Sequence, residues 1–199
     1  MGAATVYRLL VVSMLVTLPL TACGTARPDP TTSLAASAAS EAGAAGYTEQ
    51  QRILADHDIT AEEYRQAVGH HVDCLRRRGL HAEEPALNPV DGLRLIVEAT
   101  PNGRSVDDYN AAVGECALRH LSFVEAVYTA THKPVMDHQV RSHTHACLAR
   151  NAIHLPKNLE TAHDMLTAAG ADKRTIVIDC IQTSAKELRP DLKTIVIPE

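Results

Sequence analysis

The residues of this chain that could bind a metal or change charge near neutral pH are its eleven histidines. His70 adjoins His71, and His143 stands close to His145, with His138 nearby. Zinc catalysis typically uses two histidines four apart on a helix, and no two histidines here have that spacing. We therefore expect most of them to be ordinary surface residues. A metal- or haem-handling surface protein using His138, His143 and His145 stays an alternative.

Carboxylates and nucleophiles offer no recognisable catalytic set. Acidic side chains occur in adjacent pairs at Glu62–Glu63, Glu83–Glu84 and Asp107–Asp108, and adjacent side chains diverge on a helix. Two of these pairs fit the first turn of a helix, where acids interact favourably with the helix dipole. Arg76–Arg78 similarly fits a last turn. The chain has no G-x-S-x-G elbow and no glycine-rich phosphate loop. We predict no catalytic residue and no cofactor, with an envelope hydrolase as a further alternative.

Composition excludes some partners. The chain has 199 residues and a formal net charge of −5, whereas nucleic-acid-binding domains are usually basic. It has no Trp and one Phe, so bases would find little aromatic surface for stacking. Hydrophobic residues make up 45% of the chain, which is typical of a globular protein. We therefore expect no nucleic-acid partner.

The N-terminus has the pattern of an export signal. Residues 1–22 combine Arg8 with an apolar segment, Leu9–Leu20, that is too short to span the roughly 30 Å core of a bilayer. The sequence Leu20-Thr21-Ala22-Cys23 resembles the lipobox of bacterial lipoprotein precursors. The resemblance implies that Cys23 receives a diacylglyceryl group and becomes the mature N-terminus. The protein would then be anchored to the cell membrane on its extracytoplasmic face.

A segment of small and polar residues follows the lipobox. Residues 25–46 are rich in Ala, Ser, Thr, Pro and Gly and show no hydrophobic period. Such a composition buries too little apolar surface to offset the entropy of ordering. We therefore predict that residues 23–46 form a lipidated N-terminus and a flexible tether.

Four cysteines remain in the body of the chain, and export would place them where disulfides persist. The segments Cys74–His81 and Cys147–His154 match at several offsets: Cys-Leu, then Arg, a small residue, an aliphatic residue and His. A second cysteine follows 42 positions after the first copy's and 33 after the second's. Four cysteines allow three pairings, and this repetition favours one two-cysteine module duplicated in tandem. The expected disulfides are Cys74–Cys116 and Cys147–Cys180.

The first copy also resembles a known type of domain. Cys74-Leu-Arg-Arg-Arg-Gly79, with a distant second Cys on a helix that starts with acidic residues, is similar to small lipoprotein domains of high-GC Gram-positive bacteria. The likeness covers about Ala61 to Arg119, and the second copy departs from it with Ala152 in place of the Gly. This group has no established activity, so the resemblance implies a shape and a location and names no reaction.

The hydrophobic pattern gives the elements that must position these residues. Thr60 and Glu63 form a capping box, and Gly79 supplies a left-handed stop. Ser105 fits the start of a second helix. The further expected elements are a strand at Leu93–Glu98, the second helix running to about Thr131, helices opening at Pro134, over Leu159–Ala169 and over Asp172–Ala185, and a tail strand at Lys193–Ile197 paired with Leu93–Val97. The fold class is mainly α with a minor β-sheet (α+β).

These features predict two similar disulfide-braced helical modules behind the tether, over residues 47–133 and 134–199. The expected function is a lipid-anchored, non-enzymatic binding or scaffolding module of the cell envelope. Its partners would be the membrane, through the lipid on Cys23, and an unidentified envelope protein or small ligand.

Overall fold

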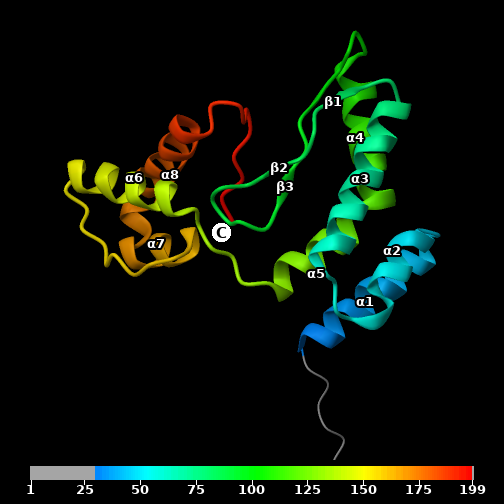
Figure 1. Cartoon of the computed structure of the whole chain (residues 1–199), viewed down its shortest axis with the longest axis horizontal. Helices are drawn as coiled ribbons and strands as arrows, with labels where there is room; N and C mark the ends of the chain where they lie inside the picture. Colours follow the sequence, from blue (N-terminus) through cyan, green and yellow to red (C-terminus); the bar gives the residue numbers. More distant parts are fainter. Residues whose placement is uncertain (1–29, 199) are drawn as a thin grey trace, which may run out of the picture.

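The computed structural model describes residues 30–198, so the predicted signal peptide and Cys23 lie outside the described residues. This part of the chain is mostly helical with two short two-stranded sheets, which confirms the predicted fold class (Figure 1). The helices are α1 Pro30–Ala44, α2 Thr48–Ile53, α3 Ala61–Arg77, α4 Val106–His120, α5 Ser122–Thr131, α6 His138–Arg150, α7 Ala162–Ala169 and α8 Arg174–Leu188. Short 3-10 turns occur at Leu54–Asp56 and Ala171–Lys173.

Figure 1 shows two helical lobes with a hairpin between them. We call α1–α5 the N-terminal lobe and α6–α8 the C-terminal lobe. The hairpin pairs β1 (His81–Ala82) with β4 (Ala99–Thr100) and β2 (Ala86–Leu87) with β3 (Leu95–Ile96), both antiparallel. Each lobe has its own hydrophobic core. Within residues 30–198, no helix combines the length and hydrophobicity needed to cross a bilayer.

The predicted tether is wrong for most of its length, because Pro30–Ala44 forms α1. Ala35, Ala38 and Ala42 are buried on one face of this helix, against α5 and α2. Alanine has the highest helix propensity and its small side chain permits close helix packing. The composition alone predicts a tether because alanine adds little to a hydrophobic pattern, although it strongly favours a helix.

The capped starts of α3 and α4 and the two disulfides follow the prediction. Thr60 Oγ1 accepts a hydrogen bond from the Glu63 main-chain N at 3.2 Å, and Glu63 Oε2 accepts one from the Thr60 N at 2.9 Å. Ser105 caps α4 with its Oγ, which accepts a hydrogen bond from the Asp108 main-chain N at 3.1 Å. Disulfides join α3 to α4 and α6 to α8, confirming both expected pairs: Cys74–Cys116 and Cys147–Cys180.

The two copies of the repeated segment end their helices identically. Leu80 N donates to Leu75 O and Gly79 N to Arg76 O in the first copy. The second copy repeats both bonds, from Ile153 N to Leu148 O and from Ala152 N to Ala149 O. This is the Schellman arrangement, which requires a left-handed residue after the helix. Gly79 and Ala152 hold that position, with φ of 79° and 56°.

Several expected boundaries differ in the structure. The helix expected over Leu159–Ala169 begins at Ala162, and the strand expected over Leu93–Glu98 is limited to Leu95–Ile96. The long helix predicted from Ser105 to about Thr131 breaks at Leu121, whose φ and ψ are −133° and −45°, and α5 begins at Ser122. The third helix does not open at Pro134. Asp137 caps it, accepting hydrogen bonds from the main chain of α6, so the helix begins at His138.

The predicted C-terminal strand is also wrong. Residues 193–198 have no regular secondary structure, and β3 pairs with β2 instead of with the tail. Side chains of the hairpin hold the tail: Glu98 Oε1 accepts from the Thr194 N at 2.9 Å, and Asn88 Nδ2 donates to Val196 O at 2.8 Å. These side chains bond some of the main-chain groups that a strand partner would have satisfied: Lys193 N, Thr194 N and Val196 O.

Candidate binding groove

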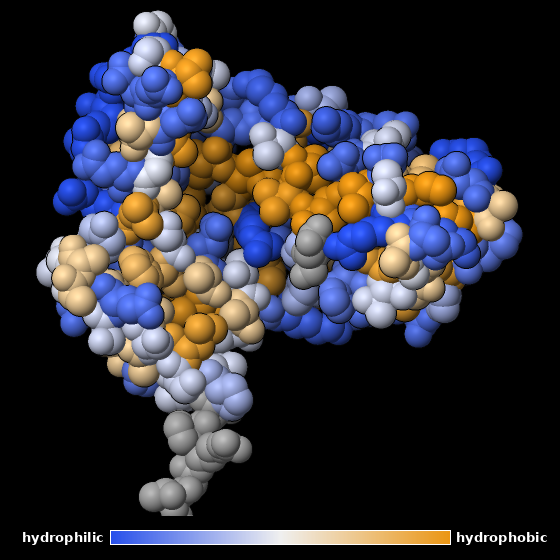
Figure 2. Space-filling model, turned by 180° about the vertical axis from the view of Figure 1, so that it is seen from behind, coloured by the Kyte–Doolittle hydropathy of each residue, from blue (hydrophilic) through white to orange (hydrophobic). Residues whose placement is uncertain are grey.

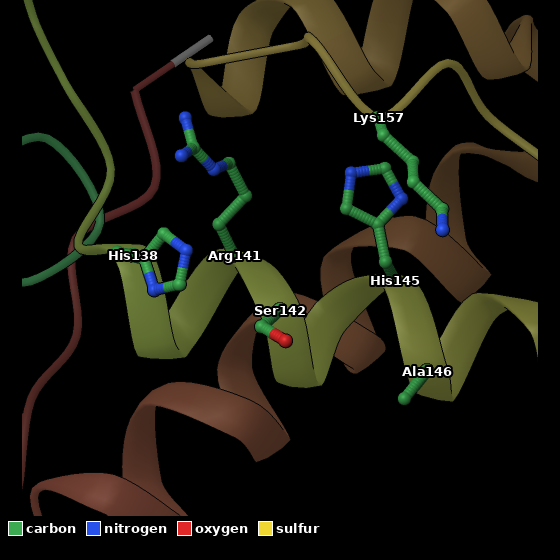
Figure 3. Close-up of a pocket in the computed structure, with 6 residues that line it drawn as sticks. All are labelled: His138, Arg141, Ser142, His145, Ala146 and Lys157. Carbon is green, nitrogen blue, oxygen red and sulfur yellow. The ribbon is translucent and has the colours of Figure 1, made fainter.

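One face of α6 carries a cluster of basic side chains. His138, Arg141 and His145 follow one another at intervals of three and four residues, which places them on the same side of a helix. Lys157, from the loop before α7, completes the cluster. Together with Ser142 and Ala146 these residues line a pocket of about 460 Å³ (Figure 3). We call it the cationic pocket.

No carboxylate lines the cationic pocket, and neither Arg141 nor Lys157 forms an ion pair within residues 30–198. Figure 3 shows the His145 ring between these two side chains. Burial lowers the pKa of His145, and the charges of Arg141 and Lys157 lower it further. Its Nε2 atom is buried without a hydrogen-bond partner among the described residues. The pocket therefore offers a fixed positive charge and donors to an anion.

The cationic pocket adjoins a second hollow of about 420 Å³, because His138 and Arg141 line both. Apolar side chains line much of this second hollow, among them Leu87, Val135 and Met136. A third hollow, of about 360 Å³, shares Leu87 and Gly92 with the second. It extends the surface toward the N-terminal lobe, where its lining includes Tyr64, Leu93, Leu95 and Tyr128.

The three hollows adjoin one another through shared lining residues, and we call them together the binding groove. Its basic end lies on α6, and the remainder is largely apolar. Figure 2 shows hydrophobic side chains gathered in the depression between the lobes. Mostly apolar concave surfaces with a few convergent polar groups are typical of small-molecule sites. The binding groove is therefore the candidate functional site.

The hairpin tip forms the floor of the groove and is tied to the connection between the lobes. Val135 N donates to Asp91 O, and Asp137 N donates to Pro89 O, both at 2.8 Å. Gly92 has a φ of 63°, and a Cβ there would lie 2.7 Å from Val135 O. Only glycine fits this approach, because that oxygen belongs to the main chain.

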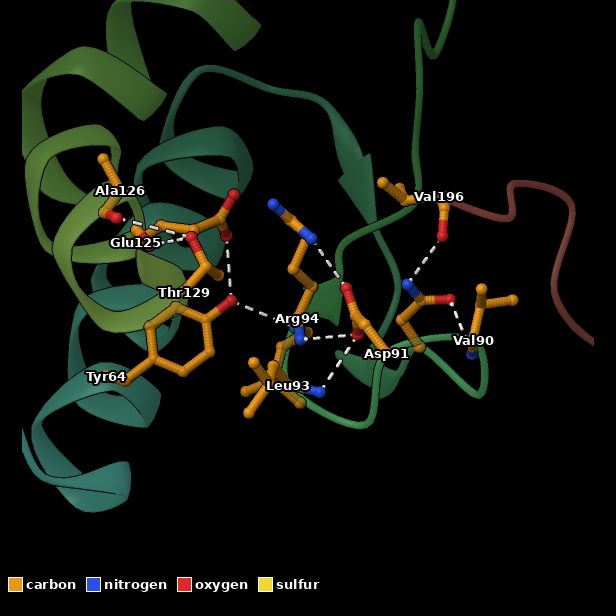
Figure 4. A network of polar contacts seen from close by, with 11 residues as sticks. Tyr64, Val90, Asp91, Leu93, Arg94, Glu125, Ala126, Thr129 and Val196 are labelled. Carbon is orange, nitrogen blue, oxygen red and sulfur yellow. Dashed lines mark hydrogen bonds and ion pairs between the residues drawn. The ribbon is translucent and has the colours of Figure 1, made fainter. Parts of the chain in front are cut away.

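A network of polar contacts holds the hairpin against α3 and α5 of the N-terminal lobe (Figure 4). Tyr64 Oη donates to Glu125 Oε2 at 2.8 Å and accepts from the Leu95 N at 3.0 Å. Burial, and then the nearby Glu125 carboxylate, raise the pKa of the Tyr64 hydroxyl, which stays protonated. Asp91 Oδ1 accepts from the Arg94 N, and the two side chains form an ion pair at 2.7 Å. Hydrogen bonds therefore hold the hairpin both to the connection before α6 and to α3.

The structure separates the histidines that the sequence grouped as metal candidates. His138 and His145 share the cationic pocket, whereas His143 faces α8, with its Nδ1 3.8 Å from an oxygen of Glu187. Within residues 30–198, no three His, Cys, Asp or Glu side chains are arranged to hold a metal ion. In this part of the chain, the three histidines of the metal-handling alternative therefore do not come together as one metal site.

Sequence reasoning missed Arg141 and Lys157. The regular spacing of His138, Arg141 and His145 was a usable signal for a polar helix face. Lys157 had none, because only the path of the loop before α7 brings it to that face.

A comparison with protein-family models, curated proteins and solved structures finds no match to this chain. Its function is therefore inferred from the groove and from the sequence.

Proposed function

We propose that this protein is a lipid-anchored binding module of the cell envelope, non-enzymatic, that holds an anionic ligand in the cationic pocket. The observation that carries the proposal is the set of basic side chains from α6 and the following loop, unopposed by any carboxylate in the pocket lining. A planar guanidinium beside an ammonium suits carboxylate or phosphate groups, and charge-assisted hydrogen bonds are stronger than neutral ones.

The location rests on the lipobox pattern at Leu20–Cys23, and the two disulfides agree with an oxidising compartment. Because α1 begins at Pro30, residues 24–29 alone separate the lipid-bearing Cys23 from the folded body. Seven residue steps span at most about 25 Å when fully extended. The anchor would then hold the folded body close to the lipid headgroups.

Membrane anchoring is tested by expressing Cys23→Ala in a bacterium that acylates lipoproteins and fractionating the cells. We expect the unchanged chain in the membrane fraction and the variant outside it, because two or more acyl chains bind a bilayer almost permanently. Thr21→Ser preserves the lipobox pattern and is the matched control. Cys23→Ala found in the membrane fraction at the level of this control contradicts the proposal.

Anion binding is tested by titrating the Cys23→Ala chain with inorganic phosphate and following the histidine NMR signals. We expect the signals of His138 and His145 to shift first. Arg141→Met should lower the affinity about tenfold, the effect of losing one charge-assisted bond. Arg150→Met removes the same charge elsewhere on α6 and should leave the affinity unchanged. If both variants bind phosphate like the parent chain, the cationic pocket is not the site.

A further inference from the structure

We propose that the ligand of the binding groove is a single-chain amphiphile with an anionic headgroup. Its headgroup lies in the cationic pocket, and its hydrocarbon chain follows the apolar hollows between the lobes. This inference rests on the proposed function and adds the chemical class of the ligand.

The first argument is the change of character along the groove. The basic end is formed by Arg141, His145 and Lys157, and the adjoining hollow begins at the same Arg141. Further along, Leu87 and Val135 expose 49% and 46% of their surface, although both are large hydrophobic residues. An anion at one end and an apolar chain along the remainder match this order of side chains.

The second argument is that most polar side chains along the apolar part already have partners. Asn88 Nδ2 donates to Val196 O, and the Asp137 carboxylate accepts from the main chain of α6. Arg189 is paired with Asp191 at 2.7 Å. The Tyr64 hydroxyl is bonded to Glu125 and to the main chain of β3.

A peptide in the groove would bring backbone N–H and C=O groups that need hydrogen-bond partners. The polar side chains just named are already engaged, so they offer such a backbone little. A hydrocarbon chain needs no hydrogen bonds and gains from leaving water. The groove therefore fits an alkyl chain better than a peptide.

The third argument is that the groove is formed before any ligand arrives. The close approach of Gly92 to Val135 O and the hydrogen bond from the Val135 N to Asp91 O fix the floor beneath the apolar part. A preformed apolar site binds its ligand without losing conformational entropy to order its own backbone.

The test compares three probes by isothermal titration calorimetry: inorganic phosphate, decyl phosphate and decanol. The chain carries Cys23→Ala, so that no acyl chain of its own competes. Decyl phosphate should bind more tightly than inorganic phosphate, by up to about fourfold for each methylene that is buried. Decanol, which lacks the charge, should bind at least about tenfold more weakly than decyl phosphate.

Variants assign the two ends of the ligand. Leu87→Gln and Val135→Asn should weaken decyl phosphate several-fold and leave inorganic phosphate unchanged, since they alter only the apolar part. Arg141→Met should weaken both. Leu118→Gln is the matched control, because Leu118 is 51% exposed but does not line the groove. Unchanged urea midpoints establish that each variant is folded.

The possible failures are distinguishable. If inorganic phosphate binds but the decyl chain adds no affinity, the amphiphile inference is wrong and the anion-binding proposal stands. If neither phosphate compound binds, both are wrong. If decanol binds as tightly as decyl phosphate, the groove is merely apolar and the assigned headgroup is wrong.

Discussion

The side-chain amide of Gln50 on α2 donates a hydrogen bond from Nε2 to the main-chain oxygen of Leu118 on α4, at 2.7 Å. Its Oε1 accepts from the main-chain nitrogens of Phe123 and Val124 at 2.9 and 3.3 Å. These backbone groups lose their partners where the helix breaks at Leu121. One fully buried side chain thus replaces the missing helical hydrogen bonds.

Gln50→Ala should therefore lower the free energy of unfolding by about 2–4 kcal/mol, because it leaves buried backbone groups unsatisfied and opens a cavity. Urea denaturation followed by circular dichroism measures the loss. Gln51→Ala, at an exposed position of the same helix, is the control and should change stability by less than about 0.5 kcal/mol. Equal losses in both variants would show that the break needs no support from Gln50.

The repeated helix ends give a reciprocal pair of substitutions. Ala152 adopts the left-handed conformation that Gly79 adopts in the other copy. In that conformation the Cβ of alanine lies too close to the following carbonyl oxygen, which costs free energy. Ala152→Gly should stabilise the protein by about 0.5–1 kcal/mol, after the greater entropy of glycine in the unfolded chain is subtracted. Gly79→Ala should destabilise it by about 1 kcal/mol. Melting temperatures that move in the same direction would contradict this account.

Local signals explain what the sequence predicted correctly. The hydrogen bonds of Thr60 with Glu63 and the stop at Gly79 depend on residues a few positions apart, so the pattern alone specifies them. The disulfide pairs followed from a repeated segment, and the two copies share the same helix end in the structure.

The wrong predictions depended on distant residues. The break at Leu121 is supported by Gln50, which is 68 positions away from Leu118 in the chain. The tail reads as a strand because it is apolar, but Glu98 and Asn88 satisfy its backbone from the hairpin. Lys157 reaches the cationic pocket through the fold of the C-terminal lobe. Patterns within one segment carry none of this information.

Stability should fall as the solution becomes acidic, through histidines at the contact between α3 and α4. Burial lowers the pKa of His71 and of His120, and for His120 the charges of His70, Arg77 and Arg119 lower it further. The native state therefore binds fewer protons than the unfolded state, whose histidines titrate near 6.5. The stabilising contribution is complete above that pH and is lost as the pH falls through it toward the lower native pKa.

Urea unfolding at several pH values between about 7.5 and 5 checks this dependence. Carboxyl groups act in a lower window, around the ordinary pKa values of 4.5 for Glu and 3.8 for Asp. His120→Gln should flatten the decline between these pH values, because it removes one of the histidines whose pKa burial lowers, the others being His71 and His145. His163→Gln, at an exposed position on α7, is the control and should keep the full slope. A parent chain equally stable across the range would refute the role of these histidines.

The C-terminal tail should stabilise the C-terminal lobe although it is not a strand. Ile195 and Ile197 pack against the core of α6, α7 and α8, and Asn88 holds the intervening Val196 O at 2.8 Å. Deletion of residues 193–199 should lower the melting temperature by about 5–10 °C, from the loss of two half-buried side chains and the tail's hydrogen bonds. Ile195→Asn combined with Ile197→Asn should reproduce most of this loss. Thr194→Ala keeps the main-chain bond to Glu98 and should melt like the parent chain. If the deletion leaves the melting temperature unchanged, the tail contributes nothing to stability.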